Sequence, residues 1–190
     1  MKSTVFAASL LALTAPAFAD AERYTIDPSH AQVIFSYDHL GFSTTYGMFS
    51  GFEGEIMFDE DDPAASTVSV SMPLKSMFTG WEQRDGHFMS GDFFDASDED
   101  LVSFTSTSIE VTGETTAKIT GDLTMNDITK SVVLETSLNK ADTHPLANKP
   151  FLGFDATTTV LRSDFGVGAF APAVSDAVEI TISLEAGKAG

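Results

Sequence analysis

Apolar and polar residues alternate along most of the chain with a period of two. From Tyr46 to Phe58 the even positions are mainly apolar or small, whereas the odd positions include Glu53 and Glu55. This alternation is typical of a β-strand with one buried face. The pattern predicts about eight strands, at residues 31–39, 46–58, 68–74, 101–111, 117–125, 132–138, 152–160 and 178–184.

Short runs of turn-forming residues separate these strands, at 59–63, 113–114, 126–127 and 144–150. Such connections leave no room for the crossover helices of a parallel sheet, so they favour an antiparallel meander. A meander that buries one face and hides its edges closes most simply into a barrel. We therefore predict an all-β, antiparallel eight-stranded barrel, with a two-sheet sandwich as the alternative.

The segment 80–95 departs from this alternation. Residues 79–82 have the spacing of a capping box, and they predict a short helical insertion from Trp81 to Met89 followed by a turn. Its aromatic residues are too apolar for a free loop, so we expect either a lid over one end of the barrel or an ordinary satellite core. These candidate lid residues are Trp81, Phe88, Phe93 and Phe94.

The first 19 residues have the features of a signal peptide. Lys2 precedes an apolar run from Val5 to Ala15, and the small residues Ala17 and Ala19 mark a cleavage site after Ala19. An uncleaved N-terminal membrane anchor is the alternative, and no cysteine follows that could carry a lipid. We therefore predict residues 20–190 to be one periplasmic domain with no stable membrane anchor.

The chain is strongly acidic and contains no cysteine. Its formal net charge of −18 falls to −19 once Lys2 leaves with the signal peptide. Such a charge opposes binding to nucleic acid and to anionic membranes, so we expect no nucleic-acid partner. Stability cannot come from disulfides, although export implies an oxidising compartment. The oligomeric state stays open, and a homodimer is compatible with the sequence.

The common motifs of catalysis are missing. The sequence contains no G-x-S-x-G, H-E-x-x-H, P-loop or G-x-G-x-x-G motif and no thiol nucleophile. The four histidines lack metal-ligand spacing, and the acidic turns lack that of an EF-hand loop. We therefore predict no metal, no cofactor and no enzyme activity. The best polar set, which could bind a head group or act as an enzyme at a barrel mouth, is His39, Arg84, Asp85 and His87.

The apolar composition is compatible with a hollow interior. The chain has 16 Phe and 7 Met, whose side chains can line an apolar cavity without needing hydrogen bonds. An eight-stranded barrel either fills with side chains, as in a structural or stress-related module, or holds one ligand. For the second case we expect these residues to line the ligand tail: Phe35, Tyr46, Met48, Phe52, Ile56, Val70, Met72, Ile119, Leu123, Leu134, Phe154 and Ile180.

Several sequence motifs resemble the YceI-like, polyisoprenoid-binding family of bacterial periplasmic proteins. They occur in the expected order over nearly the whole mature chain: Y-T-I-D-P-S-H-A at 24–31, D-H-L-G at 38–41, G-M-F at 47–49, F-E-G at 52–54, R-D-G-H at 84–87, D-F-F-D at 92–95, F-T-S-T at 104–107, G-D-L-T at 121–124, T-K at 129–130 and R-S-D-F-G at 162–166.

This resemblance implies a lipocalin-like barrel that binds an amphiphile with an isoprenoid or acyl tail. The partner would be a polyisoprenoid, a quinone-like lipid or a fatty amide. Where the family commonly has a basic residue followed by glycine, this chain has Asn126 and Asp127. A neutral or weakly polar head group is therefore expected rather than a pyrophosphate.

Overall fold

The computed structural model describes residues 21–190, so the predicted signal peptide at residues 1–19 lies outside the described residues. The described chain contains the helix α1 (Glu82–Phe88) and short 3₁₀ turns at Pro28–His30, Pro63–Ala65, Leu74–Ser76 and Arg162–Phe165. Its strands are β1 (Glu22–Ile26), β2 (Gln32–His39), β3 (Ser43–Phe49), β4 (Glu53–Phe58), β5 (Thr67–Pro73), β6 (Leu101–Val111), β7 (Thr116–Met125), β8 (Ile128–Thr143), β9 (Pro150–Leu161) and β10 (Ala177–Lys188).

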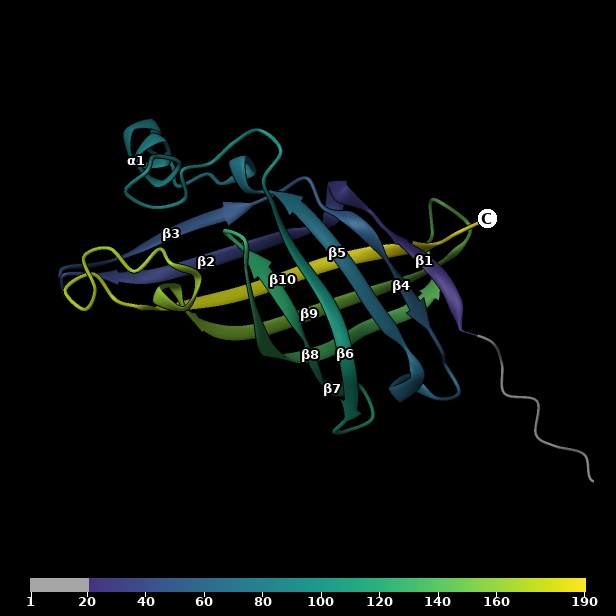
Figure 1. Cartoon of the computed structure of the whole chain (residues 1–190). Helices are drawn as coiled ribbons and strands as arrows, with labels where there is room; N and C mark the ends of the chain where they lie inside the picture. The colour runs from purple at the N-terminus through teal and green to yellow at the C-terminus, as the bar shows by residue number, and fades with distance from the viewer. Residues whose placement is uncertain (1–20) are drawn as a thin grey trace, which may run out of the picture.

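The strands close into an antiparallel barrel (Figure 1). β10 pairs with β9 along one edge, and along the other edge it pairs first with β2 and then with β1. β2 pairs with β3 and β1 pairs with β4, so β1 and β2 are two halves of one barrel strand, and β3 and β4 are halves of the next. Counted this way, the barrel has the eight strands that the sequence predicts, and its closed ring excludes the sandwich.

The strand predicted at 46–58 is interrupted between β3 and β4, where Gly51 has a φ of 72°. The break shifts the alternation by one residue, so Phe49 faces inward in β3 and Ile56 faces inward in β4. The prediction that Tyr46 and Met48 face the interior is therefore wrong. Tyr46 is 64% exposed, and Met48, two residues further along β3, lies on the same outer face of the sheet.

The segment between β5 and β6 carries α1, which lies over β3 at one end of the barrel (Figure 1). The predicted helix is present, with Trp81 and Met89 as its flanking cap residues. The predicted capping box is wrong, because Thr79 does not cap the helix. Instead, the backbone N–H and the hydroxyl of Thr79 donate to Oδ1 of Asp85, at 2.9 Å and 2.5 Å.

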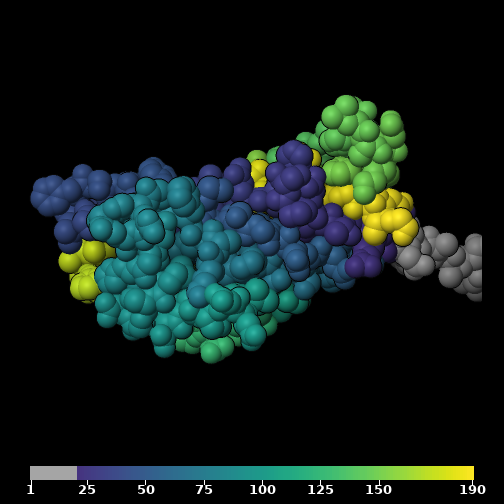
Figure 2. Space-filling model, turned by 90° about the horizontal axis from the view of Figure 1, so that it is seen from above, coloured from purple at the N-terminus to yellow at the C-terminus, as the bar shows by residue number. Residues whose placement is uncertain are grey.

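The buried apolar side chains form two clusters. The main core draws on β1 to β5 and also on β6, β9 and β10, with residues such as Val33, Phe52 and Leu74 buried. A smaller cluster at the β9–β10 connection contains Val160, Phe165 and Val167. Seen from above, the β8–β9 loop projects at the end opposite to the β2–β3 turn (Figure 2). None of the helices within residues 21–190 is long and apolar enough to cross a bilayer.

Candidate ligand-binding site

The barrel interior contains two cavities. The inner one has a volume of about 250 Å³ and reaches the β6–β7 turn. The outer one has a volume of about 720 Å³ and lies beside α1 and the β9–β10 connection. Both are lined by Phe49, Met125, Val160 and Ile180, so the cavities meet at these four side chains.

The inner cavity is apolar. Among the described residues, Glu114 in the β6–β7 turn is the only charged residue that lines it. Val70, Ile119 and Leu134 point inward yet are only half-buried, because part of their surface faces the cavity. In a filled barrel such inward residues would be buried by close-packed neighbours. The interior is therefore hollow.

The outer cavity combines apolar walls with polar groups. No carboxylate within the described part of the chain lines it, although the chain carries a net charge of −18. Its hydrogen-bonding side chains carry hydroxyls, an amide, an indole N–H, two imidazoles and two guanidinium groups. They belong to Tyr37, Ser43, Thr45, Gln83, Trp81, His39, His87, Arg84 and Arg162.

The predicted head-group residues Arg84 and Asp85 both bind Thr79. Arg84 donates Nε to the hydroxyl oxygen and Nη2 to the carbonyl oxygen of Thr79, each at 2.8 Å. Its guanidinium carbon lies 5.8 Å from the ring centre of Trp81. Arg84 lines the outer cavity, whereas Asp85 does not. The main contacts of both side chains thus fix α1 to the preceding loop.

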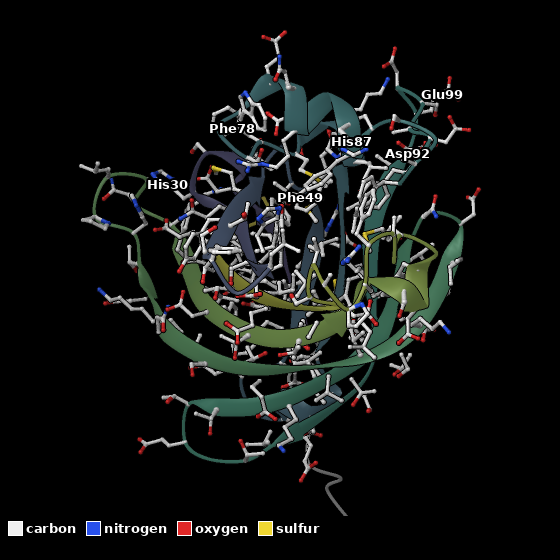
Figure 3. The ribbon with its side chains drawn as sticks, turned by 90° about the vertical axis from the view of Figure 1, so that its left-hand side faces the viewer. His30, Phe49, Phe78, His87, Asp92 and Glu99 are labelled. Atoms are coloured by element: carbon white, nitrogen blue, oxygen red, sulfur yellow. The ribbon has the colours of Figure 1, made fainter. Side chains whose placement is uncertain are left out.

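The two predicted histidines lie on different elements of the cavity wall. His87, at the end of α1, places Nε2 3.1 Å from Oδ2 of Asp92, and its ring centre lies 5.1 Å from that of Phe93. Figure 3 looks into this end of the barrel, with Phe49 in the interior and His87 and Asp92 beside α1. His39 ends β2 and forms a backbone bridge to Val174.

The candidate lid residues form one wall of the outer cavity. Trp81, Phe88, Phe93 and Phe94 all line it. The ring centre of Phe88 lies 6.3 Å from that of Tyr37 and 5.2 Å from that of Phe93. These contacts connect the helix to β2 and to the turn that follows it. The wall is therefore continuous from β2 to Phe93.

The β9–β10 connection also lines the outer cavity, and the sequence analysis missed it. Arg162 donates to the carbonyl oxygens of Val167, Ala169, Val174 and Ser175 at distances from 2.7 to 2.9 Å. Burial lowers the pKa of Arg162, and the nearby Asp176 carboxylate partly opposes this shift. The sequence signals were the R-S-D-F-G motif at 162–166 and the apolar run without alternation that follows it. Its residues in the cavity wall are Val167, Ala169, Phe170, Ala173 and Val174.

The structure brings most of the predicted tail residues together. Tyr46 and Met48 line neither cavity, for the reason given above. Ligand contact by the others stays a prediction. Those that line one or both cavities are Phe35, Phe52, Ile56, Val70, Met72, Ile119, Leu123, Leu134, Phe154 and Ile180.

A group with metal-ligand chemistry lies at the break between β1 and β2, and it lines neither cavity. Ligand atoms of Asp27, His30 and Glu185 lie within 4.8 Å of one another. Hydrogen bonds from Ser29 and His30 already occupy the Asp27 carboxylate, and they lower its pKa to about 2. Because these hydrogen bonds join residues of one turn, stabilisation of that turn explains them without a metal ion.

Comparison with known proteins identifies the family. A family model described as YceI-like domain matches residues 24–186. The chain belongs to the YceI-like family. A UPF0312 protein of Ectopseudomonas mendocina is 40% identical over 167 residues, which are 87% of this chain and 87% of that protein.

Solved structures share this YceI-like fold. BcnA of Burkholderia cenocepacia superposes with a TM-score of 0.75 at 22% identity, over 84% of this chain and 98% of that one. A polyisoprenoid binding domain from Saccharophagus degradans superposes with a TM-score of 0.68 at 11% identity, over 87% of this chain and 98% of that one. At these identities the likeness establishes the fold.

Proposed function

We propose that this YceI-like domain is a periplasmic carrier that holds the apolar tail of a long-chain lipid inside its barrel. Its cargo is an isoprenoid, quinone-like or fatty-amide amphiphile. The observation that carries this proposal is the pair of adjoining cavities, the inner one apolar, whose volumes of about 250 and 720 Å³ together lie within the range of known ligand sites. The polyisoprenoid binding domain of the same fold supports the proposal.

Burial of the tail supplies the affinity in this proposal. Each methylene removed from water contributes about 0.8 kcal/mol, so a long tail offsets its own ordering cost without any chemical step. The inner cavity has the apolar lining that such a tail requires. The tail therefore occupies the inner cavity, and the polar end of the lipid stays in the outer one.

The head group in this proposal is neutral or weakly polar. Arg84 and Arg162 are the two arginines that line the outer cavity, and their guanidinium groups already donate to backbone and hydroxyl oxygens. Arg162 uses all three of its guanidinium nitrogens in these bonds and Arg84 uses two of its three, so neither offers a whole guanidinium group to a diphosphate. Hydroxyls such as that of Tyr37 remain available for a carbonyl or hydroxyl head, so binding should depend little on salt.

The direct test is mass spectrometry of the protein and of its organic extract after detergent-free purification from the periplasm. We expect one lipid class near stoichiometric amounts and an intact mass that begins at Asp20. Delipidated protein should bind an isoprenoid alcohol more tightly than the matching diphosphate at two salt concentrations. Absence of bound lipid together with no binding of the alcohol would refute the carrier proposal, and retention of Met1 would refute periplasmic export.

A matched pair of tyrosines tests the position of the head group. Tyr37→Phe removes one hydroxyl from the outer cavity and keeps the ring that packs on Phe88. We expect it to weaken binding of the alcohol about threefold to tenfold, as for one neutral hydrogen bond. Tyr46→Phe removes a hydroxyl from the outer face and should leave binding unchanged. If the two variants bind the alcohol equally well, the head group does not contact the Tyr37 hydroxyl.

Catalysis at the mouth is the alternative that this proposal excludes. His87 and Asp92 form a pair in which the histidine could act as a base on a lipid-like substrate. Our proposal expects the extracted lipid to be chemically unchanged after incubation with the protein. Time-dependent conversion that His87→Ala abolishes would establish an enzyme instead.

A further inference from the structure

Exposed apolar side chains surround the mouth of the outer cavity. Leu40 and Phe42 lie at the β2–β3 turn, Trp81 precedes α1, and Phe170 lies in the β9–β10 connection. We call these four residues the apolar rim. Phe42 is 89% exposed and Phe170 is 62% exposed, so the described chain leaves much of their surface uncovered. Figure 1 places the three segments at the same end of the barrel.

The apolar rim is continuous with the outer cavity. Leu40, Trp81 and Phe170 line that cavity and also expose a large part of their surface to solvent. An apolar path therefore runs from the outside of the protein into the barrel. A lipid that enters along this path keeps its tail in apolar surroundings, provided that the rim itself is buried in an apolar phase.

The charge of the chain limits what can cover the rim. The formal net charge of −18 repels an anionic membrane, and it also repels a second copy of the chain. The two arginines near the rim donate to carbonyl and hydroxyl oxygens, so they offer no patch for anionic lipids. A neutral bilayer, unlike an anionic membrane or a second copy of the chain, meets no such repulsion.

The shape of the rim favours a bilayer over a protein. Protein interfaces concentrate their affinity in a packed centre, whereas the centre of this surface is the opening of a cavity. A bilayer surface is fluid, so it can fit a ring of separate side chains. Trp81 also has the side-chain type that is enriched at the interfacial level of membranes.

We propose that the apolar rim docks the mouth of the barrel onto a neutral, zwitterionic bilayer, so that lipid exchanges between bilayer and cavity without crossing water. The inference rests on the proposed function for the nature of the cargo. Docking itself needs no cargo, so it can be measured separately.

Two vesicle compositions and a matched pair of variants test the docking. The exported protein, as purified from the periplasm, is floated with phosphatidylcholine vesicles and with vesicles that also contain phosphatidylglycerol. We expect co-flotation with the neutral vesicles and weaker binding to the anionic ones. Trp81 is the only tryptophan in the chain, so brominated acyl chains should quench its fluorescence in the docked state.

Phe42→Ser should weaken partitioning into neutral vesicles by about tenfold or more, since it removes an aromatic side chain that the bilayer would bury on docking. Leu146→Ser is the control, because Leu146 is 87% exposed in the β8–β9 loop at the opposite end (Figure 2). Both variants share the same N-terminal segment, so its contribution cancels. The control should bind vesicles as tightly as the parent protein.

Three results would overturn the docking proposal. They are no flotation with neutral vesicles, equal losses in the two variants, and tighter binding to the anionic vesicles. Self-association that Phe42→Ser abolishes, without vesicle binding, would instead assign the rim to contact between copies. Vesicle binding by a protein whose extract holds no lipid and which binds no isoprenoid alcohol would refute the carrier function and leave the docking intact.

Discussion

Leu134→Phe tests whether the ligand tail reaches the inner cavity. Leu134 lies in β8, pairs with Ile119 of β7 and points into the inner cavity, where it is only half-buried. Phenylalanine adds about three carbon atoms to this side chain and introduces no polar group. The added atoms take up cavity space that the tail would otherwise fill.

The magnitude follows from the atoms displaced. Three methylenes of the tail, at about 0.8 kcal/mol each, correspond to about 2.4 kcal/mol, or roughly a 50-fold increase in the dissociation constant. The free energy of unfolding of the ligand-free protein should change by less than about 1 kcal/mol, because the ring enters empty space.

The assay is a titration of delipidated protein with a long-chain isoprenoid alcohol, combined with urea denaturation of the same samples. Val133→Phe is the matched control, because Val133 is the neighbouring residue of β8 and is 43% exposed on the outer face. It should bind as the parent does. If Leu134→Phe stays folded and its dissociation constant rises less than threefold, the tail does not occupy the inner cavity.

Three further predictions concern stability, each measured by denaturant unfolding. Arg162→Met should lower the free energy of unfolding by about 3 kcal/mol, since four carbonyl groups lose their donor, and Arg162→Lys should restore only part of it. Gly54→Ala should cost more than about 2 kcal/mol, because φ is 143° and a Cβ would lie 2.2 Å from the Ser69 carbonyl oxygen. Asp27→Asn should destabilise most between about pH 4 and pH 6.5. The pKa of Asp27 is lowered to about 2, so the stabilisation by its carboxylate disappears as pH falls toward 2. The pKa of His30 is raised by Asp27, so the stabilisation by the protonated imidazole disappears as pH rises through the raised pKa of His30. A loss in Arg162→Met that Arg162→Lys fully restores, a neutral Gly54→Ala, or an Asp27→Asn effect that persists at pH 2 would contradict the respective prediction.

The eight-stranded barrel could be predicted from the sequence, because period-two alternation reports directly which face of a strand is buried. The register of β3 could not. The residues at 50–52 continue the apparent alternation, and only the backbone at Gly51, with its φ of 72°, shows that the chain adds a residue there. That single residue moved Tyr46 and Met48 from the expected inner face to the outer face.

The candidate site was predictable where it depends on aromatic residues close together in sequence, such as Phe93 and Phe94. The role of Arg162 was not predictable, because its carbonyl partners lie 5 to 13 residues further along the chain and converge only when the β9–β10 connection folds. The sequence predicted Arg84 and Asp85 at the mouth, but only Arg84 lines the outer cavity. It could not show that both side chains bind Thr79.

Under the proposed carrier function, the hollow interior links the lifetime of the protein to the supply of its lipid. An apolar ligand in the cavities supplies contacts that core side chains supply in a filled barrel, so it completes the hydrophobic core. At a free ligand concentration about 100 times the dissociation constant, binding adds about 2.7 kcal/mol to the free energy of unfolding. Empty molecules unfold more often than loaded ones, and proteases remove unfolded chains. The steady-state amount of the protein would then rise and fall with the lipid it carries.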